Sequence, residues 1–194
     1  MSKVAVFEYY PEISIIKLNL PNGEETKIEI NPGWSFGKGT HPTTKLCIQA
    51  LEKLFKNKQI DSVLDIGCGS GVLSIASAAL GAGYIVGVDI DYTITREADS
   101  NKDINGFSSK IKIILGSIED VPGKFDLVVA NILIDSIIAI SSELTKRTTP
   151  VGTLLLSGIK NEQKNRAIEK FAELGYHLEK EYKEKQWVAL VFKQ

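Results

Sequence analysis

Residues 63–71 read Val-Leu-Asp-Ile-Gly-Cys-Gly-Ser-Gly, a short apolar run that leads straight into a glycine loop. The apolar run predicts a strand that is buried on both faces. Glycines at every second position allow the backbone to turn sharply and to approach a ligand closely. Apolar residues then recur at helical spacing until Gly81, which predicts a helix that ends there. We therefore expect a strand, a loop and a helix, with a cofactor where strand meets helix.

An acidic residue follows the loop at the distance expected in a nucleotide-binding unit. Asp89 lies about 22 residues after Gly67, at the end of a second apolar run over 85–88. A carboxylate at this position of a βαβ unit binds the ribose hydroxyls of a nucleotide. Asp89 alone could be the solvated end of a strand. The combination of strand, glycine loop, helix, second strand and acid favours ribose binding.

The spacing of the glycines narrows the choice of nucleotide. Dinucleotide-binding loops follow G-x-G-x-x-G and place a helix N-terminus against a pyrophosphate. Here the spacing is G-x-G-x-G, preceded by Asp65, which suits a cofactor that has no phosphate and a cationic end near the loop. S-adenosylmethionine fits this description, and the pattern resembles the first motif of the seven-stranded methyltransferases. Asp65 has two interpretations: it lies near the cationic end, or it holds the loop through backbone N–H groups.

Length and composition exclude several classes of protein. The 194 residues suit one domain with a sizeable core. Lys and Arg number 23 against 24 Asp and Glu, so no net basic field is present to attract nucleic acid. Cys47 and Cys68 have no second Cys or His at ligand spacing, so the sequence predicts neither a metal site nor a disulfide. We therefore expect a reducing, cytoplasmic setting. No apolar run approaches the length needed to span a membrane.

The N-terminal part predicts a small β-structure and a functional loop. Residues 13–20 and 26–30 are rich in β-forming residues and are separated by a Pro-Asn-Gly turn. We expect a β-ribbon extension over residues 1–30 and a catalytic domain over 31–194. The long glycine-bearing and aromatic loop over 31–44 is of the kind that carries function. A helix over 44–54 should follow, with Thr43 as its N-cap.

The remainder alternates strands and helices. Asp91 is the expected N-cap of a helix that ends before Gly106, and the connection 116–124 is too short for a regular helix. Five strand–helix units and a terminal hairpin over 176–192 predict a doubly wound, Rossmann-like α/β sheet of seven strands with the last strand antiparallel. The later elements are expected as strands over 111–115, 127–130 and 152–156, and as helices over 134–144 and 167–174.

Several segments together resemble the PrmA family, and they occur in the family's order from about residue 28 to the end. The most specific are Thr-His-Pro-Thr-Thr at 40–44 and Asn-Ile-Leu at 131–133. Pro32-Gly33, Phe36-Gly37, the glycine loop, Gly-Val-Asp-Ile-Asp at 87–91, Ser-Gly-Ile at 157–159 with Gln163, and Trp-Val-Ala-Leu-Val at 187–191 also match. The family methylates large-subunit ribosomal protein eleven on lysine side chains and its N-terminal amine. The resemblance implies a class I S-adenosylmethionine-dependent methyltransferase that releases S-adenosylhomocysteine and has a ribosomal protein as partner.

The resemblance assigns cofactor binding to Thr44, Gly67, Asp89 and Asn131. Asn131 follows the fourth strand and is also the predicted catalytic residue, orienting the acceptor through its amide or backbone carbonyl; a turn residue is the alternative. Ser117 and Ile118 are candidates to border the adenine. The complete predicted cofactor set is Phe36, Gly37, Thr44, Gly67, Cys68, Gly69, Asp89, Ile90, Ser117, Ile118 and Asn131.

The roles of the aromatic residues and the histidine in the loop have two interpretations each. Trp34 and Phe36 either cover the adenosine or pack the loop. For His41, a structural, hydrogen-bonded role is favoured over a catalytic one. The family usually carries an N-terminal recognition domain, and here about 30 residues precede the match, so the acceptor is open. Lys38 stands where the family usually has threonine, and Gln186 stands where it has glutamate.

Two other functions remain as alternatives to protein methylation. One is methylation of a small molecule or RNA base, and the other is cofactor binding without turnover. The glycine spacing disfavours a dehydrogenase. The oligomeric state is not predicted.

Overall fold

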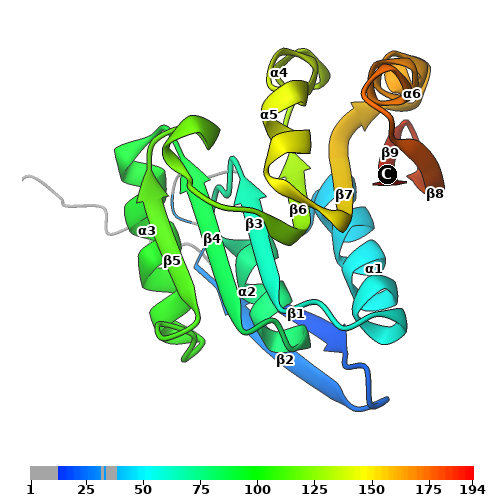
Figure 1. Cartoon of the computed structure of the whole chain (residues 1–194). Helices are drawn as coiled ribbons and strands as arrows, with labels where there is room; N and C mark the ends of the chain where they lie inside the picture. The colour runs from blue at the N-terminus through cyan, green and yellow to red at the C-terminus, as the bar shows by residue number, and fades with distance from the viewer. Residues whose placement is uncertain (1–12, 32, 34–38) are drawn as a thin grey trace, which may run out of the picture.

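A seven-stranded sheet forms the centre of the computed structural model, which describes residues 13–31, 33 and 39–194 (Figure 1). The strands lie in the order β5-β4-β3-β6-β7-β9-β8. The first five are parallel neighbours, and β9 is antiparallel to both β7 and β8, which confirms the predicted sheet. The strands are β3 Ser62–Ile66, β4 Tyr84–Asp89, β5 Ile111–Leu115, β6 Phe125–Asn131, β7 Thr148–Lys160, β8 His177–Glu184 and β9 Trp187–Lys193.

The order of the strands reverses between β3 and β6. From β3 the chain adds β4 and β5 on one side and then returns to place β6 on the other side. In open α/β sheets this reversal leaves a crevice outside the carboxyl ends of the two strands, where ligands bind. The topology therefore places the expected site next to Ile66 and Asn131, the last residues of β3 and β6.

Helices cover both faces of the sheet, so its central strands are buried on two sides. Val63 of β3 packs into a core with α1 and α2, whereas the next residue, Leu64, packs into a second core with α4, α5 and α6. None of the helices in the described part of the chain is long and apolar enough to cross a membrane. The helices are α1 Pro42–Asn57, α2 Val72–Leu80, α3 Tyr92–Ile104, α4 Ile134–Ala139, α5 Ser141–Lys146 and α6 Lys164–Glu173.

Short 3₁₀ turns occupy two connections. The link from β5 to β6 contains only η1 Ile118–Asp120, as the length of residues 116–124 predicted. A capping box holds this turn: the Ser117 side chain accepts the backbone N–H of Asp120, and Asp120 Oδ2 accepts the backbone N–H of Ser117 at 2.8 Å. The Ser117 hydroxyl also lies 3.1 Å from Asp120 Oδ2. The second turn, η2 Asn161–Gln163, joins β7 to α6.

The N-terminal ribbon packs onto the same core as the first two helices. β1 Ser14–Asn19 and β2 Glu25–Ile30 form an antiparallel pair. Their inward residues Leu18, Ile28 and Ile30 are buried in one cluster with α1 and α2. The ribbon predicted before residue 30 is present, and the domain boundary at that residue stays a prediction.

Three elements differ from the sequence expectation. α1 begins at Pro42 and its N-cap is His41, not Thr43, because the His41 ring accepts the backbone N–H of Thr43. The strand expected over 152–156 extends over Thr148–Lys160 in β7, since pairing with both β6 and β9 prolongs it. The helix expected over 134–144 is divided at Ile140 into α4 and α5.

Replacing Ile28 by alanine should lower the free energy of unfolding by about 2 to 4 kcal/mol, because it leaves a cavity in the shared core. Ile15→Ala, on the exposed side of the ribbon at 62% exposure, is the matched control and should change it by less than about 0.5 kcal/mol. Urea unfolding measures both variants. An equally small effect for Ile28→Ala would show that the ribbon does not unfold with the core.

Candidate active site

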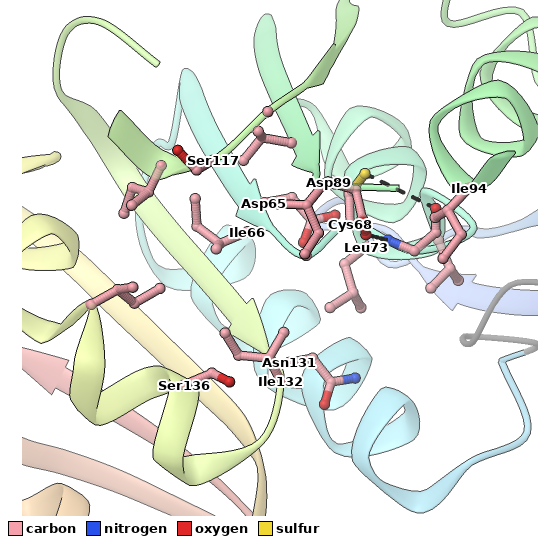
Figure 2. A pocket seen from close by; sticks show the side chains of 18 of the residues that line it. Asp65, Ile66, Cys68, Leu73, Asp89, Ile94, Ser117, Asn131, Ile132 and Ser136 are labelled. Carbon is pink, nitrogen blue, oxygen red and sulfur yellow. Dashed lines mark hydrogen bonds between the residues drawn. The ribbon is translucent and has the colours of Figure 1, made fainter. Parts of the chain in front are cut away.

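A cavity of about 450 Å³ opens where the carboxyl ends of β3, β4 and β6 meet (Figure 2). This volume lies in the range of small-molecule sites. Its walls come from segments distant in sequence: the start of α1, the glycine loop, the ends of the strands, η1 and α4. The lining residues are Thr44, Asp65, Ile66, Gly67, Cys68, Gly69, Val72, Leu73, Val88, Asp89, Ile90, Ile94, Gly116, Ser117, Ile118, Glu119, Asn131, Ile132, Ser136 and Ile140.

The glycine loop closes against the end of β4. The backbone N–H groups of Gly67 and Cys68 both donate to the carbonyl oxygen of Val88, at 2.9 and 3.1 Å. Gly67, Gly69 and Gly71 have left-handed φ angles of 65°, 57° and 79°, a conformation that residues with side chains rarely adopt. The predicted strand, loop and helix are thus confirmed, and the loop backbone forms one wall of the cavity.

The carboxylate of Asp89 is held in position by the loop that it faces. Its Oδ2 accepts the backbone N–H of Gly69 at 3.1 Å, and its Oδ1 accepts that of Asp91 at 3.2 Å. Each carboxylate oxygen keeps a second lone pair. Because Asp89 also lines the cavity, it has the capacity to accept hydrogen bonds from two ligand hydroxyls.

Asp65 acts as the cap of α2. Its Oδ2 accepts both the backbone N–H and the hydroxyl of Ser74, at 3.0 and 2.7 Å. Ser74 lies in the first turn of α2, whose N-cap Gly71 makes no side-chain hydrogen bond. Asp65 therefore satisfies a backbone donor that would otherwise lack a partner. Asp65 thus bonds to one backbone N–H group, which belongs to the first turn of α2 and not to the glycine loop, while its proximity to a cationic cofactor end stays a prediction.

Burial changes the acidity of three groups near the cavity. Desolvation raises the pKa of Asp65 from 3.8 to about 6, and the hydrogen bonds from Ser74 offset only part of this effect. Burial likewise raises the pKa of Cys47 to about 12 and that of Cys68 well above its usual value. Both cysteines are therefore protonated thiols at neutral pH and pack as small apolar groups.

Two buried oxygen atoms at the cavity have no partner among the described residues. They are Oγ1 of Thr44, near the start of α1, and Oδ1 of Asn131, at the end of β6. A buried polar atom without a hydrogen bond costs about 1 to 3 kcal/mol. The two residues line the same cavity, so a ligand with polar groups would remove this penalty.

Three more of the predicted cofactor residues line the cavity from β4 and η1. Ser117 and Ile118 line the cavity at η1, and Ile90 lines it at the end of β4 with 81% of its surface exposed. Phe36 and Gly37 lie outside the described residues, as does Trp34, so these assignments stay predictions. All other residues of the predicted set line the cavity.

His41 has the structural role that its sequence context favoured. Besides capping α1, its ring lies edge-on to the ring of Trp187, with 5.2 Å between the centroids. This contact joins the N-terminus of α1 to the start of β9. His41 is not among the residues that line the cavity.

Residues 12–194 match the family model described as "Ribosomal protein L11 methyltransferase (PrmA)". The chain belongs to this family. Curated relatives of the same name occur in Geobacter sp. (strain M21), 43% identical over 171 residues, and in Geotalea uraniireducens (strain Rf4), 39% identical over 176 residues. These matches cover 86% of the chain but 55% and 56% of the relatives, so the chain spans about half of their length.

Solved structures agree with the family and the fold. The crystal structure of a ribosomal protein L11 methylase from Lactobacillus delbrueckii subsp. bulgaricus superposes with a TM-score of 0.78 at 31% identity, covering 85% of this chain and 83% of that one. A T. thermophilus 16S rRNA methyltransferase in complex with AdoMet and guanosine gives 0.72 at 21% identity, covering 94% and 50%. The second likeness concerns the fold alone.

Sequence reasoning missed part of the wall in this PrmA chain. Ile132, Ser136 and Ile140 line the cavity from the segment after β6, but the sequence pattern predicted only Asn131 of this segment as a site residue. Ser136 and Ile140 are four residues apart and so share a side of the helical segment. That spacing is a usable signal, but only the fold shows that this side borders the cavity.

The pH dependence of stability should reveal Asp65. A carboxyl group with a raised pKa binds its proton more tightly in the folded state, so its contribution is complete below the unfolded pKa of 3.8 and is lost as the pH rises to about 6. The difference between these two pKa values corresponds to roughly 3 kcal/mol of folding free energy. Asp65→Asn keeps an acceptor for the Ser74 N–H but does not titrate.

Urea unfolding of both proteins from about pH 4 to about pH 7 measures this difference. The wild type should lose stability relative to Asp65→Asn between about pH 4 and about pH 6 and run parallel to it above about pH 6. Parallel curves throughout would mean that Asp65 ionises as it does in the unfolded chain.

Proposed function

We propose that this chain is an S-adenosylmethionine-dependent methyltransferase that acts on protein amines, with ribosomal protein L11 as acceptor. The proposal rests on three residues that line one cavity. Thr44 Oγ1 and Asn131 Oδ1 are buried oxygens with no partner among the described residues, and the carboxylate of Asp89 is held in place by the glycine loop. The family and the names of its curated members support the acceptor.

The polar and apolar groups that line the cavity fit the parts of the cofactor. Asp89 would hold the ribose hydroxyls, and Ile90, Ser117 and Ile118 offer an apolar wall with one hydroxyl for the adenine. The amino-acid end would meet Gly67 and Thr44, whose buried hydroxyl has no partner among the described residues. No phosphate-binding group is needed, in agreement with the close glycine spacing. When bound, the cofactor supplies an electrophilic methyl group on a sulfonium.

The chain itself has to align the acceptor and keep it reactive. An amine attacks only when its lone pair is free, so a neutral hydrogen-bond acceptor beside it is more useful than an anion, which would favour the ammonium form. Asn131 Oδ1 is such a neutral acceptor and is buried at the cavity. The carboxylate of Asp65 bonds to Ser74 instead. Alignment and exclusion of water are the main contributions expected of the protein.

A transfer assay tests the proposal directly. The chain is incubated with methyl-labelled S-adenosylmethionine and purified bacterial ribosomal protein L11, and mass spectrometry locates the label. Methylated lysine side chains or a methylated N-terminal amine are expected. If the chain binds the cofactor but transfers the methyl group only to RNA or to small molecules, ribosomal protein L11 is not the acceptor. Cofactor binding with no transfer to any of these would overturn the enzymatic assignment.

Replacing Asp89 by alanine should weaken binding of S-adenosylmethionine roughly 100-fold, since charge-assisted hydrogen bonds to two hydroxyls are lost. Isothermal calorimetry with the cofactor, its demethylated product and NAD measures this. Asp99→Ala, on α3 and paired with Lys102, removes an acid that does not line the cavity and should bind normally. Binding of NAD by the wild type would contradict the methyltransferase assignment.

Asn131 should show its role in the pH–rate profile. Asn131→Ala is expected to lower kcat about 100-fold through lost alignment. Asn131→Asp keeps an oxygen at the same place but adds a charge that favours the ammonium form, so its profile should move to higher pH. A profile for Asn131→Asp that coincides with the wild type would remove Asn131 from contact with the acceptor amine.

A further inference from the structure

Ile132 lies between two glycines that come from different strands. A Cβ atom on Gly67, in the loop after β3, would lie 2.6 Å from Ile132 Cγ2. A Cβ atom on Gly158, near the end of β7, would lie 2.2 Å from the carbonyl oxygen of Ile132. Ile132 is therefore packed on two sides: its side chain contacts Gly67, and its backbone contacts Gly158.

The position of Gly158 follows from the pairing of β7. The parallel register of β6 and β7 ends with Asn131 opposite Ser157, so Gly158 comes directly after the last pair. On its other side β7 shifts register against β9 between Leu156 and Ile159, and Gly158 has a left-handed φ of 80°. This bulge brings the Gly158 backbone against the segment that leaves β6.

Backbone conformation alone does not account for this glycine. Gly175, after α6, has nearly the same φ, 81°, but a Cβ atom there would meet nothing within 4 Å. An alanine at either position adopts the same unfavourable conformation. Only at Gly158 does the added carbon also collide with backbone atoms, which lie 2.2, 2.8 and 3.0 Å away and all belong to Ile132.

We propose that Gly158 is a positioning residue that sets the place of the Ile132 backbone, and with it the Asn131 side chain, relative to the glycine loop. This inference rests on the function proposed above. Real Cβ atoms essentially never approach closer than 3.0 Å, so an alanine would move the Ile132 carbonyl by roughly 1 Å in a closely packed region. A displacement of that size near reacting groups lowers rates about 100-fold.

The test compares Gly158→Ala with Gly175→Ala. Both variants should lose a few degrees of thermal midpoint from the shared backbone strain. With methyl-labelled S-adenosylmethionine and ribosomal protein L11, Gly158→Ala should lower kcat about 100-fold and change the Kd of the cofactor less than about threefold, because Asp89 and the glycine loop stay in place. Gly175→Ala should keep the wild-type kcat. Equal kcat values for the two variants, or a cofactor Kd weakened as strongly as kcat, would overturn the proposal.

A second measurement does not depend on activity. Amide hydrogen exchange at residues 132–134 should become at least about tenfold faster in Gly158→Ala and remain unchanged in Gly175→Ala. If the wild type transfers no methyl group to ribosomal protein L11, the proposed function fails, while the exchange data still decide the positioning role. Unchanged exchange in Gly158→Ala would overturn it independently.

Discussion

The buried hydrogen bonds between Asp65 and Ser74 support the wall of the cavity that the glycine loop forms. Gly71 gives α2 no side-chain cap, so the carboxylate of Asp65, on β3, replaces it across the glycine loop. These bonds tie β3 to α2 at the two ends of the loop. Burial of the Asp65 carboxyl group raises its pKa. In the same loop, the backbone N–H groups of Gly67 and Cys68 bond to Val88 of β4.

The rest of the site depends on the same arrangement. Asp89 takes its orientation from the Gly69 N–H of that loop, and Ile132 packs where Gly67 has no side chain. The wall formed by the glycine loop and the wall formed by the segment after β6 are therefore in direct contact.

Much of this could be predicted from local sequence. The glycine spacing, Asp65 and Asp89 predicted the loop, the helix and the cavity, since each depends on residues within one βαβ unit. The errors occurred where distant elements decide the outcome. β7 is longer than its apolar run because it pairs with strands on both sides, and His41 rather than Thr43 caps α1, in a position where its ring also contacts Trp187.

The sequence by itself determined the class of fold, the glycine loop and several of the residues that line the cavity, because strand and helix periodicity and glycine conformation are local properties. The tertiary structure alone decided which side of the segment after β6 borders the cavity, why Gly158 has to lack a side chain, and which buried oxygens have no partner in the part of the chain that the structure describes. These features depend on distances between strands that are neighbours only after folding, and no spacing along the chain encodes such distances.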